Sequence, residues 1–107
     1  MPTLIIHTPY SQIDLNEKRS FSQTVEKSIG YGYAISNRLF KQLSPGDPVV
    51  VICKEHRKQA EGQLQELKPT EKAENGMQRY DVLMANLKTS EYTHENTKLE
   101  RTGVQVL

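Results

Sequence analysis

The chain has 107 residues, the length of one small domain, and its 36% hydrophobic and 25% charged residues are typical of a polar but foldable sequence. A formal charge of +1 excludes the strongly basic class of non-specific DNA-binding proteins. The charge is uneven: residues 1–60 carry 8 Lys/Arg and 5 Asp/Glu (+3), and residues 61–107 carry 6 and 8 (−2). A local basic face in the first half is therefore expected.

The single cysteine, Cys53, excludes an internal disulfide framework and favours a reducing, cytoplasmic location. No apolar run reaches the roughly 18 residues of a transmembrane helix, so no membrane partner is expected. No phosphate-cradling glycine motif is present, and no cofactor is expected. The strand-like end Thr-Gly-Val-Gln-Val-Leu is compatible with a domain of a longer parent chain.

The first predicted elements are extended. Leu4-Ile5-Ile6 has the apolar character of a short strand, and the polar residues 8–24 are expected to form a long loop or lid. The segment Gly30-Tyr31-Gly32-Tyr33 predicts an irregular extended stretch with a sharp turn, because glycine tolerates unusual backbone angles. Tyr31 and Tyr33 would share one side if the backbone is extended.

A helix is predicted over residues 37–43. Ser36 can cap its first turn, and Ile35 and Phe40 have the spacing of a hydrophobic staple. One helical face carries the apolar residues Ile35, Leu39, Phe40 and Leu43. The sequence Ser44-Pro45-Gly46-Asp47 then predicts the end of the helix and a turn.

The rest of the chain predicts strands. The continuous β-branched run Pro48–Cys53 indicates a central strand buried on both faces. The further predictions are a charged hairpin loop at 54–58, a half-buried strand at 60–65, a polar connection at 68–78, a strand at 80–87, a polar segment at 88–101, and a last strand at Val104 and Val106 that pairs with the first. These elements predict a single mainly β domain of residues 1–107, with one or two short helices (α+β) and a small, curved antiparallel sheet or barrel.

Residues 35–87 resemble the PUA-like superfamily, in particular its EVE and ASCH branches. The resemblance lies in a short helix, a Gly46-Asp47 turn into the strand Val-Val-Val-Ile, a charged loop, and the small-residue strand Ala-Glu-Gly-Gln-Leu that contains Gly62. It implies a pseudo-barrel that binds RNA or DNA, often at a modified base, with Gly46, Asp47 and Gly62 in architectural roles. Trp, common in such base pockets, is absent here, so Tyr31, Tyr33 or Tyr80 would have to replace it.

Two groups of residues are candidates for nucleic-acid contact. Tyr31 and Tyr33 could stack on bases, and the competing interpretation places them in the core of a domain without Trp. Cationic side chains could contact phosphates, and the competing interpretation is a solvated loop and helix face. These basic candidates are Arg38, Lys54, His56, Arg57 and Lys58, with Lys41 beside Arg38 on the helix.

Other chemistry is less well supported. Cys53 and His56 have Cys-x-x-His spacing, but no second pair completes a zinc site, and Cys53 is expected to be a small buried strand residue. Asp47, Glu66 and Lys68 match the loose pattern of a metal-dependent nuclease, the third hypothesis for function. No Gly-x-Ser-x-Gly nucleophile motif is present.

The leading hypothesis is a non-catalytic nucleic-acid-recognition module, acting alone or as the targeting domain of a larger restriction or RNA-modification machine. The alternative is a protein-interaction or assembly domain in which an edge of the barrel pairs with a strand of a partner.

Overall fold

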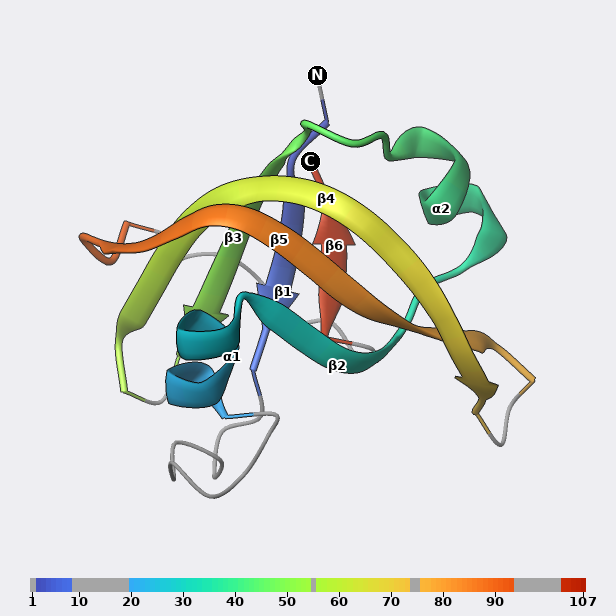
Figure 1. Ribbon diagram of the computed structural model, residues 1–107, viewed down its shortest axis with the longest axis horizontal. Helices are drawn as coiled ribbons and strands as arrows, with labels where there is room; N and C mark the ends of the chain where they lie inside the picture. The colour runs from blue at the N-terminus through green and yellow to red at the C-terminus, as the bar shows by residue number, and fades with distance from the viewer. Residues whose placement is uncertain (1, 9–19, 55, 74–75, 94–102) are drawn as a thin grey trace.

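The computed structural model describes residues 2–8, 20–54, 56–73, 76–93 and 103–107. Six strands form one sheet with the order β2-β5-β4-β3-β1-β6. Figure 1 shows this sheet curled into a half-barrel, with β4 and β5 arching across β3, β1 and β6. The elements are β1 (Leu4–His7), α1 (Phe21–Lys27), β2 (Ile29–Ala34), α2 (Asn37–Gln42), β3 (Pro48–Cys53), β4 (Lys58–Lys72), β5 (Gln78–Ser90) and β6 (Val104–Val106). The predicted fold, mainly β with one or two short helices and a curved sheet, is confirmed, and the described residues contain two helices.

One strand pair differs from the antiparallel expectation. β1 and β3 are parallel, with Leu4 opposite Val49 and Ile6 opposite Val51. Parallel strands require a long crossover between them, and the intervening chain, which includes α1, β2 and α2, provides it. The predicted pairing of the last strand with the first is confirmed, because β6 lies antiparallel to β1.

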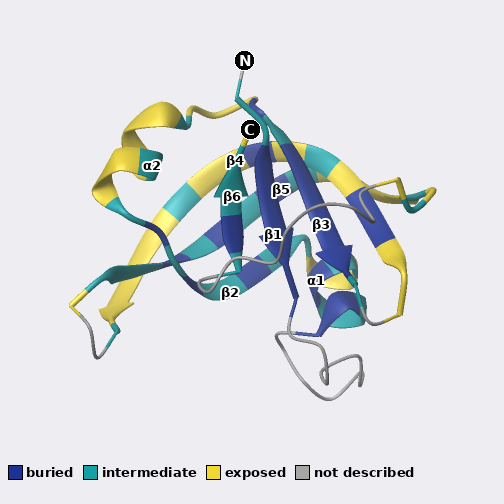
Figure 2. Cartoon of the chain, turned by 180° about the vertical axis from the view of Figure 1, so that it is seen from behind, coloured by how far each residue is buried: buried dark blue, intermediate teal, exposed yellow. Residues whose placement is uncertain are grey.

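β3 is buried on both faces, as its continuous apolar sequence predicts. Val49 and Val51 belong to the large core inside the curl, whereas Val50 and Ile52 belong to a small cluster on the opposite face. Figure 2 shows β1 and β3 as the most continuously buried strands. Cys53 is fully buried in the large core, which confirms its prediction as a small strand residue.

The β4–β5 hairpin is longer than its sequence predicts. Residues 68–78 were expected to be a polar connection, yet β4 continues to Lys72 and β5 begins at Gln78. Past the strand ends, Ala73 N–H donates a hydrogen bond to the Met77 carbonyl (2.8 Å), and Gly76 N–H donates one to the Ala73 carbonyl (2.9 Å). Backbone pairing extends past the core here, so side-chain hydropathy gives no signal for it. At its other end β5 continues to Ser90, into the segment 88–101 that the sequence describes as polar and charged.

The prediction of a loop over residues 8–24 is wrong for its last residues, because α1 begins at Phe21. Ser20 caps this helix by accepting a hydrogen bond from Gln23 N–H (3.1 Å), and Phe21 and Thr24 are buried. Seven residues are too short for a clear helical period, which explains why the sequence pattern missed them. The part of the predicted loop at 9–19 lies outside the described residues.

α2 confirms the helix that the sequence predicts over residues 37–43. Ser36 accepts a hydrogen bond from Leu39 N–H (3.3 Å) and caps the helix. Phe40 is 40% exposed, and its ring stacks on Tyr80 with centroids 5.1 Å apart. The turn that follows also matches its prediction, since the Asp47 carboxylate accepts a hydrogen bond from Ser44 N–H (2.8 Å). No helix in the described ranges is long and apolar enough to cross a membrane.

A β-bulge at Gly62 bends the long hairpin. Glu61 pairs with Lys88 and Gln63 with Ala85, so Gly62 lies opposite two residues of β5. One of these two, Asn86, has a left-handed φ of 56°. Bulges of this kind increase the local twist and bend the strand. Gly62 therefore has an architectural role, as expected, because it lies at the bulge that bends the hairpin.

Gly62→Ala is expected to lower the free energy of unfolding by about 1–3 kcal/mol, because an added methyl overpacks the strand contact. A Cβ at this position would lie 2.8 Å from the Ala85 carbonyl oxygen and 2.9 Å from Leu87 Cα, both backbone atoms. Urea denaturation measures the change. The control is Gln65→Ala, at an exposed position of the same strand, with an expected effect within about 0.5 kcal/mol. Equal midpoints for the two variants would contradict the packing argument.

Candidate nucleic-acid interface

The structure separates the predicted basic residues into two groups. Lys54, His56, Arg57 and Lys58 lie in or beside the β3–β4 hairpin, whereas Arg38 lies on α2. Figures 1 and 2 place this hairpin and α2 at opposite ends of the sheet. The five side chains therefore do not form one continuous patch, and Arg38 does not extend the basic surface of the hairpin.

The two candidate tyrosines are also separated. Tyr33 is 1% exposed and lies in the large core, and Tyr31 is half-buried. β2 has a register shift between Gly30 and Tyr33, and Gly32 has a φ of +70°, so the strand is not regularly extended. The condition for Tyr31 and Tyr33 to share one side is not met. In this structure the ring of Tyr33 cannot stack on a nucleobase.

Side chains from β5 hold this irregular part of β2. The Arg79 guanidinium donates a hydrogen bond to the Gly32 carbonyl (2.7 Å), and Asp81 Oδ1 accepts one from Gly32 N–H (3.1 Å). The two side chains replace the backbone partners that the register shift removes from Gly32. The sequence contains no local signal for this contact, which joins residues about half the chain apart.

The β3–β4 hairpin presents its basic side chains to solvent. His56, Arg57 and Lys58 are exposed, and Lys54 is half-buried. Arg57 has a left-handed φ of 53°, and its N–H donates to the Lys54 carbonyl (3.3 Å). The Arg57 guanidinium lies over the Tyr92 ring, 5.1 Å from the centroid, a cation–π geometry that restricts its orientation. Glu55 lies outside the described residues.

A pocket of about 410 Å³ lies between this hairpin, α1 and the end of β5, and we call it the hairpin pocket. Its wall combines two apolar side chains, hydroxyl groups, a buried amide and two cations. None of the described residues that line it carries a carboxylate. The lining consists of Phe21, Ser22, Val25, Arg57, Lys58, Gln59, Thr89 and Ser90.

Gln59, 2% exposed, forms the polar base of this region. Its amide nitrogen donates to the Ser90 hydroxyl (3.2 Å) and the Thr93 hydroxyl (3.3 Å), and its oxygen accepts from Thr93 N–H (3.0 Å). This network fixes the end of β5 against the start of β4, directly beside Arg57 and Lys58. Sequence reasoning missed these residues, because a Gln at the start of an alternating strand gives no sign that it is buried.

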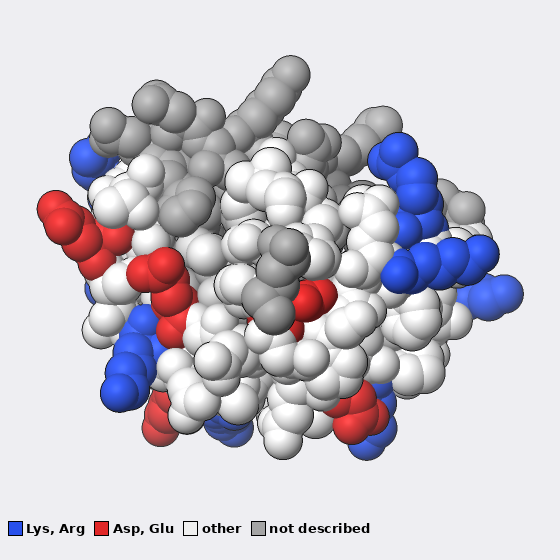
Figure 3. Space-filling model, turned by 90° about the horizontal axis from the view of Figure 1, so that it is seen from above, with Lys and Arg blue, Asp and Glu red and all other residues white. Residues whose placement is uncertain are grey.

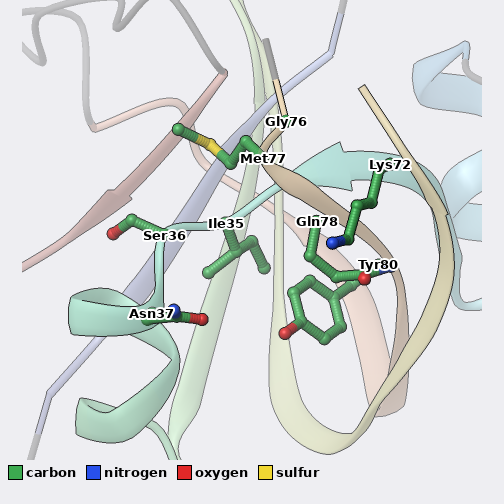
Figure 4. Close-up of a pocket in the computed structure, with 8 residues that line it drawn as sticks. All are labelled: Ile35, Ser36, Asn37, Lys72, Gly76, Met77, Gln78 and Tyr80. Atoms are coloured by element: carbon green, nitrogen blue, oxygen red, sulfur yellow. The ribbon is translucent and has the colours of Figure 1, made fainter. Parts of the chain in front are cut away.

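Tyr80, the third tyrosine considered for a base pocket, lies at the α2 end. Figure 4 shows it in a second pocket of about 550 Å³ between the start of α2 and the β4–β5 turn, with Asn37, Lys72 and Gln78. Because Phe40 stacks on Tyr80, one side of the Tyr80 ring is already occupied. The hairpin pocket, which has two adjacent cations, is therefore the better candidate for an anionic ligand.

The charge on the surface is mixed. Figure 3 shows both signs around one face, with Lys and Arg gathered at the end where Figure 1 places α2. α2 contributes the exposed cations Arg38 and Lys41 to that end. The molecule thus has cationic side chains at both ends of the sheet instead of one basic face.

The residues considered for metal chemistry do not converge. Within the described part of the chain, no group of three or more His, Cys, Asp or Glu side chains could hold a metal ion. Asp47 is buried and its carboxylate caps the turn at Ser44, whereas Glu66 and Lys68 are exposed on β4. Cys53 is buried while His56 is exposed. The Asp47 carboxylate is therefore engaged in holding the turn before β3.

The burial of Tyr33 leads to a stability prediction. Tyr33→Ala is expected to cost about 3 kcal/mol or more in the free energy of unfolding, because it leaves a large cavity in the core. Tyr31→Ala, at the half-buried neighbour, is expected to cost about 1 kcal/mol. Urea titrations followed by circular dichroism give both values. A Tyr33 variant as stable as the Tyr31 variant would show that Tyr33 is not a core residue.

Comparison with known proteins assigns no family to the chain. No family model, no curated protein and no solved structure matches it. Function is therefore inferred from the residues and geometry of the hairpin pocket and of the α2 end.

Proposed function

We propose that this protein is a non-catalytic nucleic-acid-recognition module whose binding site is the hairpin pocket. The observation that carries the proposal is the position of Arg57 and Lys58 at a pocket with an apolar side formed by Phe21 and Val25. Cations at the edge of an apolar pocket fit a nucleotide, which is charged at its phosphate and flat and largely apolar at the faces of its base.

The size and chemistry of the pocket favour one unpaired nucleotide. A volume of about 410 Å³ lies in the range of small-molecule sites. Arg57 and Lys58 would contact the phosphates, and the hydroxyls of Ser22 and Thr89 could supplement these charged contacts. The base would lie against Phe21 and Val25. A rigid duplex cannot place a paired base in such a pocket, so the expected ligand is single-stranded or locally opened DNA or RNA.

The resemblance to the PUA-like superfamily supports the same proposal. The curled sheet with two short helices is compatible with the pseudo-barrel that the resemblance implies. Members of that superfamily bind RNA or DNA, and EVE-type members often recognise a modified base. We therefore include in the proposal the sensing of a modified base and the targeting of a larger restriction or modification machine.

Arg57→Ala/Lys58→Ala is expected to weaken binding to short single-stranded oligonucleotides by about tenfold or more, equal to roughly 1.4 kcal/mol. Fluorescence anisotropy with labelled DNA and RNA measures the affinity at salt concentrations from about 50 to 200 mM. Loss of two phosphate contacts should also reduce the slope of log affinity against log salt by about 1.4 for a single strand. Oligonucleotides with methylated bases, tested alongside, show whether the pocket prefers a modified base.

The matched control is Arg38→Ala/Lys41→Ala, which removes the same net charge from α2 at the opposite end of the sheet. This variant should retain most of the affinity and the full salt slope attributable to the hairpin. An equal loss in both double variants would indicate a general charge effect and contradict the assignment of the site. No binding of the parent protein to any oligonucleotide at low salt would rule out the function.

A further inference from the structure

The open edge of the sheet carries a second inference, independent of nucleic-acid binding. Because the half-barrel does not close, β6 and β2 are the two edge strands of the described sheet. A groove of about 460 Å³ lies along β6 and reaches the end of β2 and the start of α2, and we call it the edge groove. Its lining consists of Ala34, Ser36, Arg38, Leu39, Met77, Val104, Gln105, Val106 and Leu107. It shares no residue with the hairpin pocket.

The backbone of β6 is arranged to accept another strand. On the β1 side, Thr3 and Leu107 exchange two hydrogen bonds (2.8 and 2.9 Å), and His7 N–H donates to the Gly103 carbonyl (2.7 Å). Bonding direction alternates along an antiparallel strand, so the peptide groups of Val104 and Val106 point away from β1. Edge strands are commonly protected by charged residues, proline or bulges. The three residues of β6, Val-Gln-Val, contain no charged residue and no proline.

The side chains around this edge favour an apolar ligand with one negative charge. Leu39 and Met77 are half-buried and line the groove opposite β6. Figure 4 shows that Met77 and Ser36 extend away from Tyr80, toward β6. Arg38 is exposed and is the one charged side chain among the described residues of the lining. The lining thus offers a hydrophobic wall and a single cation to whatever pairs with the edge.

We propose that the edge groove binds an extended segment of a partner protein, which adds to β6 as a seventh strand. The peptide groups of Val104 and Val106 would pair with its backbone, an apolar side chain would lie against Leu39 and Met77, and an acidic side chain would face Arg38. This is recognition by β-strand addition, in which the backbone supplies affinity and the alternate side chains supply specificity. A peptide fits better than a nucleic acid, because outward peptide groups in strand register match another peptide backbone.

Amide hydrogen exchange tests the strand pairing directly. The probe is the peptide acetyl-Thr-Val-Glu-Val-Glu-Val-Thr-amide, added to the ¹⁵N-labelled protein at up to about 1 mM, a concentration that detects binding of roughly −4 kcal/mol. The amides of Val104 and Val106 should become protected, whereas Leu107, already bonded to Thr3, should change little. A peptide of the same sequence with N-methylated valines should give no protection, because it lacks the pairing N–H groups.

Arg38→Glu tests the charge preference without altering a buried residue. The substitution should lower the affinity for the acidic peptide by about fivefold or more, as expected for the loss of an ion pair of about 1 kcal/mol. It should strengthen binding of the counterpart peptide with Lys in place of Glu. The control is Lys41→Glu, the same charge change on the same helix at an exposed residue outside the groove lining. This control should alter either affinity by about twofold or less, because Lys41 does not line the groove and an exposed charge without direct contact to the peptide contributes little.

Three results would overturn the proposal. The first is the absence of protection at Val104 and Val106 when the acidic peptide is present. The second is equal binding of the N-methylated peptide. The third is an oligonucleotide that shifts the resonances of the edge groove while the peptide does not, which would make the groove a nucleic-acid surface. Arg57→Ala/Lys58→Ala should bind the peptide normally, so failure of this proposal and failure of nucleic-acid binding are distinguishable.

Discussion

The curvature of the long β4–β5 pair is the constraint on which the rest of the fold depends. Strands of 15 and 13 residues enclose a core only if they bend, and the register shifts along this pair provide the bends. Gly62 permits one of them, because its missing side chain leaves room for the backbone of Ala85 and Leu87. The bent pair brings Leu64 and Met84 over the core strands β3 and β1. The same bend leaves β2 and β6 as separate edges.

The half-barrel divides the functional surface into two ends. The basic hairpin and α1 form a pocket at one end, and α2 lies beside the free edge of β6 at the other. The two sites share no lining residue, so occupation of one does not block the other directly. If both proposals hold, the protein would bind nucleic acid at one end and a partner strand at the other, as a targeting module in a larger assembly must.

Part-buried polar contacts fix the geometry of two parts of the sheet. The Gln59 amide bonds to Ser90 and Thr93 beside the hairpin, and the side chains of Arg79 and Asp81 bond to the backbone of Gly32 in β2. Gln59 is buried, and a buried polar group left without its partner costs about 1–3 kcal/mol, so the contacts of Gln59 resist rearrangement. Their positions depend on strand register, a property of the folded sheet.

The sequence by itself determined the elements that local physics specifies. The β-branched run at Pro48–Cys53, the Ser36 cap and the turn at Asp47 depend on neighbouring residues, and all three occur as predicted. Tertiary structure decided the rest. The exposed end of the β4–β5 hairpin, the seven-residue α1, and the parallel β1–β3 pair depend on backbone pairing or on packing against distant strands. The candidate site divides in the same way. The basic hairpin was visible in the chain, but the burial of Tyr33, the separation of Arg38 from that hairpin and the place of Gln59 in the pocket lining depend on how the sheet pairs and curls.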